Sequence, residues 1–403
     1  DNIISDGRPS LGFTGNMDTY KPAEGSATRS DIAITDPDFK YPSLWKSNIA
    51  ADYKFGDGWV ATVELLYSKD INAIYHDNIG LYRTEQFVND GGAGNARPYY
   101  NGYYSDREGN QKAANHVVML RNTSKGHSLY TTFQLQKNFV DGILKGLYLN
   151  GSYSFGQSRG VTDGTSSVAT SAWKYRAALD GNAEEVGYTA GSFDGRLLLS
   201  ASYTANWSKY AATSFGLIYQ RYRPFRYSYC YNGDANGDSQ FSNDLMYIPA
   251  NFDEVKDHLL PGDFDSQEDA WKAMNAFIEQ DPYLSKHRGE YAERNGAVAP
   301  FANQLDLSVS HDIKIYQKNG RSHTLRFSFN IANFLNLLNR NWGVVQTTVL
   351  GNQQYQFLTI PKGQGPSAAN NYTLKYTMAK DLDETFKDNL NDVSRWQMQF
   401  GIK

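Results

Sequence analysis

The clearest pattern in the chain is an alternation of apolar and polar side chains between Arg196 and Trp207. One set of alternate residues is apolar or aromatic, and the other set is mostly hydroxyl and amide. Successive side chains of a β-strand point to opposite faces, so this segment is expected to have one apolar face and one polar face. A tilted strand of about 9 to 11 residues just spans the hydrocarbon core of a bilayer. We therefore predict a transmembrane strand with lipid on its apolar side and a water-filled lumen on the other.

The same alternation recurs along the chain and gives nine candidate strands in total. They are residues 45–55, 59–67, 127–139, 147–155, 196–207, 212–222, 304–315, 323–334 and 396–402. One such segment could belong to a soluble β-sandwich, but the connections here alternate strictly between short and long. Outer-membrane barrels have this asymmetry, with short periplasmic turns and long external loops. The sequence thus predicts an all-β, antiparallel transmembrane β-barrel with long extracellular loops, and no repeat unit indicates a solenoid or propeller.

The connections carry their own expectations. Residues 1–43 lack a sustained period and are expected to be surface loop, with a strand remnant near 11–14. A long polar loop is expected at about 82–126, and the strand that begins at residue 59 is expected to continue past Ile74. An Asn-Gly pair at 319–320 is typical of a hairpin turn.

The longest connection, 223–303, is expected to be a large extracellular loop with internal structure, because structureless loops of this length are uncommon. Ser266 can cap a helix over 267–280. That helix would carry one apolar stripe, formed by Ala270, Trp271, Met274, Phe277 and Ile278. Packing of the stripe onto the barrel rim is the simpler interpretation, and a partner-binding helix is the alternative.

Composition excludes several classes of protein. The 403 residues contain 39 Lys and Arg against 43 Asp and Glu, so a net charge of −4 gives no electrostatic case for nucleic-acid binding. No apolar run approaches 18 residues, so transmembrane helices are not expected. The single Cys230 rules out an internal disulfide and a multi-cysteine metal site. No signal peptide opens the chain although a barrel requires export, so we expect Asp1 to begin a mature fragment.

Two clusters could bind a ligand or an ion. The first is an aromatic stripe that follows the strand at 212–222 and consists of Phe225, Tyr227, Tyr229 and Tyr231. It could stack a sugar or a peptide, or it could be a girdle at the barrel rim. The second has the oxygen spacing of an EF-hand-like calcium loop and consists of Asp234, Asn236, Asp238, Gln240 and Asp244.

The calcium pattern is incomplete. Ser239 stands where such loops have glycine, and Leu245 stands where a bidentate acid is expected. An Asx-rich turn that caps itself is therefore the alternative to a site for Ca²⁺ or another hard cation. Ca²⁺ is the only cofactor that the sequence suggests.

Charged residues of the candidate strands would face the lumen. They are Lys46, Glu64, Asp306, Asp312 and Arg326. Charge-paired filling of the barrel is the simpler interpretation, and contact with a plug or a substrate is the alternative. The seven His residues are scattered, and neither H-E-x-x-H nor G-x-S-x-G occurs, so we do not expect an enzyme.

Several blocks carry a family resemblance. They include Asp-Phe-Lys-Tyr-Pro at 38–42, Asp-Ala-Asn-Gly-Asp at 234–238, Asn-Asp-Leu at 243–245, Tyr-Ile-Pro at 247–249, Arg-Gly at 288–289, Glu-Arg-Asn-Gly at 293–296, Asn-Phe-Leu-Asn-Leu-Leu-Asn at 333–339, Trp-Gly at 342–343 and Arg-Trp-Gln at 395–397. From about residue 36 onward, the chain resembles the C-terminal barrel half of TonB-dependent outer-membrane receptors. The Oar-like group, which has a carboxypeptidase-regulatory-like N-terminal domain, is the most similar.

The resemblance implies a domain organisation and a function. Residues 1–403 would be the C-terminal part of a barrel of about 22 strands, the number typical of plugged outer-membrane transporters. External loops would bind a scarce ligand, such as an oligosaccharide, a peptide or a chelate. An upstream plug would gate the lumen, and an inner-membrane TonB complex would supply energy through an N-terminal region that is missing here. Outer-membrane lipid and a surface lipoprotein are further expected partners.

Two other functions remain open, namely a passive porin-type channel and a surface adhesin or structural barrel. Nine strands of a wider barrel would share its curvature, so the first and last of them should not meet.

Overall fold

The structure is a computed structural model that describes residues 31–92, 96–103, 116–164, 166–316, 322–351 and 354–403. The expected strand remnant near 11–14 and the Asn-Gly turn at 319–320 lie outside these residues. The chain is mainly β-structure, and its largest element is a twelve-stranded sheet. No helix of the described residues is long and apolar enough to cross a membrane.

Nine strands of this sheet lie at the nine predicted positions. They are β2 (Ser43–Phe55), β3 (Trp59–Asn78), β7 (His127–Asn138), β8 (Leu147–Gly160), β10 (Arg196–Asn206), β11 (Ala211–Tyr222), β17 (Ala302–Tyr316), β18 (Ser322–Ala332) and β24 (Gln397–Ile402). Each of the nine pairs antiparallel with the next along the chain, so the sheet is a meander. The predicted all-β class and the nine strand positions are confirmed.

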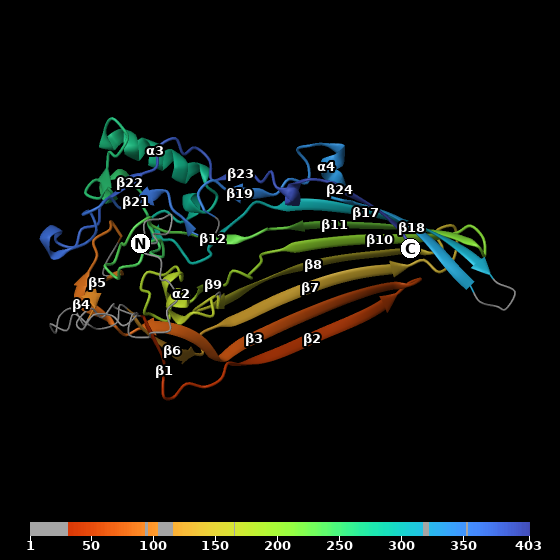
Figure 1. The fold of residues 1–403 in the computed structure, drawn as a ribbon, viewed down its shortest axis with the longest axis horizontal. Coiled ribbons are helices and arrows are strands. Elements are labelled where there is room, and N and C mark those ends of the chain that lie inside the picture. The colour runs from red at the N-terminus through yellow and green to blue at the C-terminus, as the bar shows by residue number, and fades with distance from the viewer. Residues whose placement is uncertain (1–30, 93–95, 104–115, 165, 317–321, 352–353) are drawn as a thin grey trace, which may run out of the picture.

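The short connections and the long ones lie at opposite ends of the sheet (Figure 1). Residues 56–58, 139–146 and 207–210 make the short turns. The long connections are 79–126, 161–195, 223–301 and 333–396, and they leave the other end of the sheet. Most of their residues fold against one another there, whereas 333–344 stay beside the sheet with α4 (Phe334–Leu338) next to β17. We call the described residues of 79–126, 161–195, 223–301 and 345–396 the loop body. Its two longer helices are α2 (Ala169–Lys174) and α3 (Gln267–Gln280).

The remaining elements are short. In the first part of the chain they are β1 (Ile32–Thr35), β4 (Leu81–Phe87), β5 (Pro98–Tyr103), β6 (Val117–Thr123), β9 (Gly187–Tyr188), β12 (Arg226–Tyr229), β13 (Tyr247–Ile248), η2 (Phe252–Glu254) and β14 (Leu259–Leu260). After α3 they are η3 (Leu284–Lys286), β15 (Glu290–Tyr291), β16 (Ala297–Val298), α4 (Phe334–Leu338), β19 (Gln346–Thr348), β20 (Gln354–Tyr355), β21 (Leu358–Thr359), η4 (Ala368–Asn370), β22 (Tyr376–Met378), β23 (Phe386–Asp388) and η5 (Asp392–Ser394).

Four of these elements lie in two segments that were expected to be loops. Part of the expected N-terminal loop forms β1, which pairs parallel with β6. The expected polar loop at 82–126 contains β4, β5 and β6. Both segments were too short or too mixed in polarity to show a period of two. The expected continuation of the strand past Ile74 is confirmed, because β3 reaches Asn78 and pairs with β6 there.

The register of the sheet keeps the predicted faces apart. Leu199 lies opposite Gly151 and Tyr219, whereas Ser200 lies opposite Asn150 and Ile218. One face presents apolar side chains to the surroundings, including Ile49, Leu65, Phe133, Leu135, Tyr153, Phe155, Leu199, Phe215, Ile313, Phe327, Met398 and Phe400. An apolar surface that extends over nine strands is far larger than the apolar patches on ordinary soluble proteins.

The opposite face is mostly polar, with apolar exceptions such as Leu198 and Ile218, and its polar side chains bond across the strands. Gln134 Nε2 donates to Asn150 Oδ1 at 2.8 Å, and Gln220 Nε2 donates to Gln304 Oε1 at 2.8 Å. Such cross-strand pairs satisfy polar groups while they stabilise the pairing of the strands.

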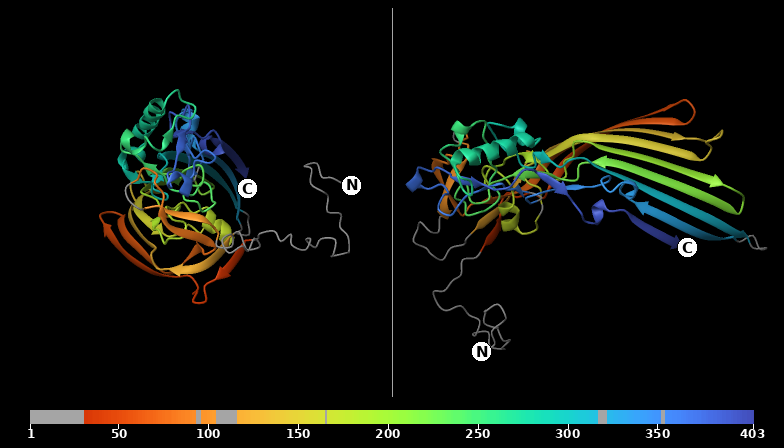
Figure 2. Two further views of the ribbon diagram at one scale, coloured as in Figure 1. Left: turned by 90° about the vertical axis from the view of Figure 1, so that its left-hand side faces the viewer. Right: turned by 90° about the horizontal axis from the view of Figure 1, so that it is seen from above.

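The two outer strands of the meander, β2 and β24, do not pair with each other. Among the described residues, β2 pairs only with β3 and β24 only with β18. Figure 2 shows them at opposite edges of a curved sheet. The expectation that the first and last strands do not meet is confirmed for this chain.

The core of the molecule lies in the loop body. Helix α3 has the predicted bounds, and Ser266 Oγ accepts from the backbone N–H of Asp269 at 3.1 Å. Its apolar stripe is buried at Ala270, Met274, Phe277 and Ile278. These side chains belong to one hydrophobic cluster with Tyr229, Phe357 and Tyr376. The stripe is therefore used for local packing, but it packs against the other long connections and not, as expected, onto the rim of a barrel.

Candidate functional site

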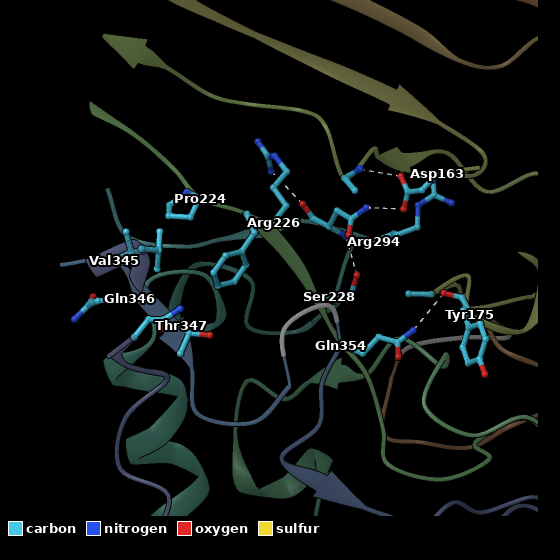
Figure 3. A pocket seen from close by; sticks show the side chains of 16 residues that line it. Asp163, Tyr175, Pro224, Arg226, Ser228, Arg294, Val345, Gln346, Thr347 and Gln354 are labelled. Atoms are coloured by element: carbon cyan, nitrogen blue, oxygen red, sulfur yellow. Dashed lines mark hydrogen bonds between the residues drawn. The ribbon is translucent and has the colours of Figure 1, made fainter. Parts of the chain in front are cut away.

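A cavity of about 430 Å³ lies where three long connections meet at the loop-body end of the sheet. Figure 3 shows its lining. The lining residues are Asp163, Tyr175, Ala177, Ala190, Pro224, Phe225, Arg226, Ser228, Arg294, Asn295, Val345, Gln346, Thr347, Gln354, Asn389 and Val393. The first four belong to the connection after β8, the next six to the connection after β11, and the last six to the connection after β18.

Asn295 joins two of these connections. Its φ of 52° is in the left-handed region, which asparagine tolerates better than most residues. Its side-chain Nδ2 donates to Asp163 Oδ2 at 3.0 Å, and its backbone N–H donates to Ser228 Oγ at 2.8 Å. Its carbonyl oxygen accepts from Arg226 Nη1 at 3.0 Å. Figure 3 labels its three partners, Asp163, Arg226 and Ser228, and this network fixes one wall of the cavity.

Two buried arginines support the same wall. Arg226 donates from Nε to the Ser192 carbonyl oxygen at 2.8 Å and pairs with Asp194. Arg294 donates to the carbonyl oxygens of Gly160 and Val161, where β8 ends. Burial lowers the pKa of both guanidinium groups below the ordinary value, because it disfavours their charged form. The hydrogen bonds of these arginines thus go to the protein itself and hold the connections in place. The polar contacts to a ligand would have to come from other lining residues.

The remaining lining combines apolar and amide side chains. Phe225 and Val345 provide apolar surface, and Gln346, Gln354 and Asn389 provide amide groups that both donate and accept hydrogen bonds. Gln354 Nε2 already donates to the Tyr175 carbonyl oxygen at 3.3 Å. Concave sites with apolar surface and a few convergent polar groups are typical of small-molecule binding. The cavity is therefore suited to a neutral or amphipathic ligand, such as a sugar or a short peptide.

The predicted aromatic stripe divides between the cavity and the core. Phe225 is half-buried and lines the cavity. Tyr227, Tyr229 and Tyr231 are at most 1% exposed, and the Tyr229 hydroxyl donates to Asp281 Oδ2 at 2.6 Å. The three tyrosines pack within the hydrophobic cluster of the loop body, so in this fold they form neither a stacking surface nor a rim girdle. Sequence spacing placed them on one face but could not show that α3 covers that face.

The acidic loop caps its own backbone. Asp234 accepts hydrogen bonds from the backbone N–H groups of Asn236, Gly237 and Ser239, at 3.2, 2.6 and 2.8 Å. Asp238 Oδ1 accepts from the backbone N–H of Gln240 at 2.8 Å. No group of three or more acidic, histidine or cysteine side chains in the described part of the chain is arranged to hold a metal. The geometry thus fits the self-capping alternative for these residues.

Charge is nevertheless concentrated around this loop. Arg97 Nη1 lies 3.0 Å from Asp244 Oδ1 and its Nε lies 3.1 Å from Asp90 Oδ2, all fully buried. Burial raises the pKa of Asp244 to about 7, although Arg97 opposes the shift. Burial, and then the neighbouring Asp244 and Asp234 carboxylates, raise the pKa of Asp238 well above its usual range. The Arg97 guanidinium is thus surrounded by more buried carboxyl groups than it can neutralise.

The expected lumen charges lie on the polar face of the sheet. Arg326 forms two hydrogen bonds to Asp312, at 2.6 and 2.7 Å, which fits charge-paired filling. Glu64 accepts from Asn48 Nδ2 at 2.6 Å, and Asp306 accepts from the backbone N–H of Asn333 at 2.8 Å. The side chain of Lys46 is exposed.

Sequence reasoning missed most of the cavity. Asn295 lies in a block that carried the family resemblance, but nothing assigned it a role. Gln346 and Gln354 lie in a connection without any periodic pattern, so no sequence signal pointed to them.

Comparisons with known proteins add nothing to these observations. No protein-family model matches the chain, and no curated protein or solved structure matches it either.

Proposed function

We propose that the nine-stranded meander is part of the wall of an outer-membrane β-barrel. The observation that carries this proposal is the exposed apolar face, which runs across all nine strands opposite a hydrogen-bonded polar face. Water would oppose such a surface, whereas lipid would solvate it. In the complete protein, further strands would pair with β2 and β24, because an open sheet edge is costly in hydrocarbon.

Aromatic residues at the turn end of the sheet support the same placement. Tyr53, Phe55 and Trp59 stack in a row with ring centroids 5.9 and 6.2 Å apart. The Lys137 ammonium lies 5.5 Å from the centroid of the Trp59 ring and also bonds to the Asp57 carbonyl oxygen. Aromatic girdles and lysines that extend toward water are typical of the membrane interface.

Within that placement, the chain acts as a TonB-dependent transporter of a scarce ligand. The family resemblance suggests this role, and the folded loop body with its cavity supports it, because such a body can bind a ligand before uptake. A passive porin-type channel and an adhesin or structural barrel are the competing functions. An oligosaccharide or a short peptide fits the mixed lining of the cavity better than a highly charged chelate.

The test measures ligand binding and uptake with the complete protein. Purified protein is incubated with libraries of oligosaccharides and peptides, and the retained ligands are identified by mass spectrometry. Gln354→Ala should lower retention by about fivefold to 150-fold, since burial of an unpaired polar ligand group costs about 1 to 3 kcal/mol. Lys272→Ala, on the exposed side of α3, is the matched control and should leave retention unchanged.

Uptake of a retained ligand is then measured in cells with and without TonB. Loss of uptake without TonB is the expected result. Uptake that persists would favour a passive channel, and binding without any uptake would favour an adhesin.

A further inference from the structure

Four arginines gather where the apolar face of the sheet meets the loop body. Arg159 and Arg221 continue the alternate sets of β8 and β11 that carry Phe155 and Tyr219 on the apolar face. Arg223 and Arg226 follow in the next residues of the chain. We call these four residues the arginine cluster.

The cluster is held by aromatic rings. The guanidinium carbons of Arg221 and Arg223 lie 4.4 and 4.1 Å from the centroid of the Phe301 ring. Those of Arg159 and Arg226 each lie 4.3 Å from the centroid of the Tyr188 ring. Cation–π contacts orient guanidinium groups without neutralising them.

Carboxylates neutralise only part of this charge. Asp194 pairs with both Arg223 and Arg226, and Glu293 pairs with Arg159. Arg221 is exposed and makes no ion pair with a described carboxylate. Buried Arg226 and Asp194 neutralise each other, so the surface carries Arg159, Arg221 and Arg223 against Glu293. A positive charge of about two therefore remains on this surface.

The position of the arginine cluster along the membrane normal matches the upper edge of the apolar band that would face lipid. Strand β11 runs from Ala211, beside the turn-end Tyr210, to Arg221 near its other end. At roughly 3.3 Å per residue this separation is about 33 Å along the strand. With a strand tilt of about 40° it is about 25 Å along the membrane normal, which is the usual height of the apolar band.

A hollow of about 420 Å³ connects the cluster to the apolar face. Leu129 and Phe155 line it from the sheet, and Tyr188, Asp194 and Arg226 line it from the loop body. One side of the hollow is thus apolar, and the other side carries the Arg226–Asp194 ion pair. Arg223 adjoins that side through Asp194, and Arg159 adjoins it through the Tyr188 ring. An amphiphile could therefore place its acyl chain in the hollow and its headgroup on these arginines.

We propose that this surface binds a phosphorylated lipid of the outer leaflet, with its phosphate on Arg159, Arg221 and Arg223 and an acyl chain in the hollow. Arg226 supports these residues from below, because its guanidinium group is buried and already bonded to Ser192, Asn295 and Asp194. Guanidinium groups match phosphate oxygens in pairs and carry less tightly held water than ammonium groups. The proposal rests on the membrane placement proposed above.

The test uses the complete protein in a neutral detergent. Native mass spectrometry measures the binding of diphosphorylated lipid A, of its dephosphorylated counterpart and of inorganic phosphate. The variant Arg221→Gln/Arg223→Gln should bind the diphosphorylated lipid about 30-fold more weakly. This factor corresponds to a loss of about 1 kcal/mol of binding free energy for each arginine. Arg196→Gln is the matched control, because Arg196 lies at a similar position on the polar face, where it bonds to Gln220.

Equal binding by the double variant and the wild type, or equal binding of both lipids, would overturn the proposal. Inorganic phosphate that binds as tightly as the phosphorylated lipid would mark a free-anion site and also overturn it. Protease protection in phospholipid vesicles is measured in parallel for every variant. Normal protection with lost lipid discrimination would refute the headgroup site alone, whereas lost protection in the wild type would refute the membrane placement.

Discussion

The two faces of β10 make a sharp prediction for one pair of neighbouring residues. Leu199 is 41% exposed on the apolar face, and Ser200 lies on the polar face beside Asn150. An arginine at the middle of the lipid-facing band costs about 2 to 4 kcal/mol, and an arginine in a wet lumen costs much less. Leu199→Arg should therefore lower the folding equilibrium constant by about 30-fold to 1000-fold, and Ser200→Arg should change it little.

The assay follows the reversible folding of the complete protein into phospholipid vesicles at increasing urea concentrations. Both variants add the same side chain at adjacent positions of one strand. The effect of the added charge on the unfolded state is therefore the same in both, and a difference between their midpoints reports on the folded state. The reasoning predicts a lower urea midpoint for Leu199→Arg only. Equal midpoints, or a lower midpoint for Ser200→Arg, would show that the faces are assigned wrongly.

Three further predictions concern the loop body. Phe277→Ala should destabilise it by about 3 to 5 kcal/mol because a fully buried ring is lost, which limited proteolysis can measure. Tyr229→Phe should cost about 1 to 3 kcal/mol, since buried Asp281 loses a hydrogen bond, and an unchanged proteolysis rate would contradict this. The raised pKa values of Asp238 and Asp244 mean that the folded loop holds protons between about pH 4 and pH 7 that the unfolded loop releases, so loop stability should fall as pH rises through that window. Asp238→Asn should slow cleavage at pH 8 without added metal, whereas a calcium site would show faster cleavage in calcium with this variant.

The strands were predictable because their physics is local. A strand with one apolar face and one polar face alternates at every second residue, and the segment around Leu199 does so with Leu198 as its one exception. The short turns beside these strands fixed the register and therefore the pairing. Even the bounds of α3 followed from Ser266 and the spacing of its apolar stripe.

The cavity and the arginine cluster were not predictable, because long-range packing decides them. Phe225 and Tyr227 belong to the same stripe, yet one lines a cavity and the other is buried, since α3 and β20 cover only part of the stripe. Asn295 gains its role from contacts to residues far away in the sequence. The pairing of Asp194 with two arginines likewise depends on how two connections fold together.

The central claim is that one face of the meander contacts lipid, and its most direct test is a lipid-quenching scan of β10. Single cysteines placed from residue 197 to 206 are labelled with an environment-sensitive fluorophore in the complete protein, where native Cys230 is fully buried. Brominated lipid chains should quench the labels at odd positions such as Leu199 and spare those at even positions such as Ser200. Quenching that does not alternate, or that is absent throughout the strand, would contradict the claim.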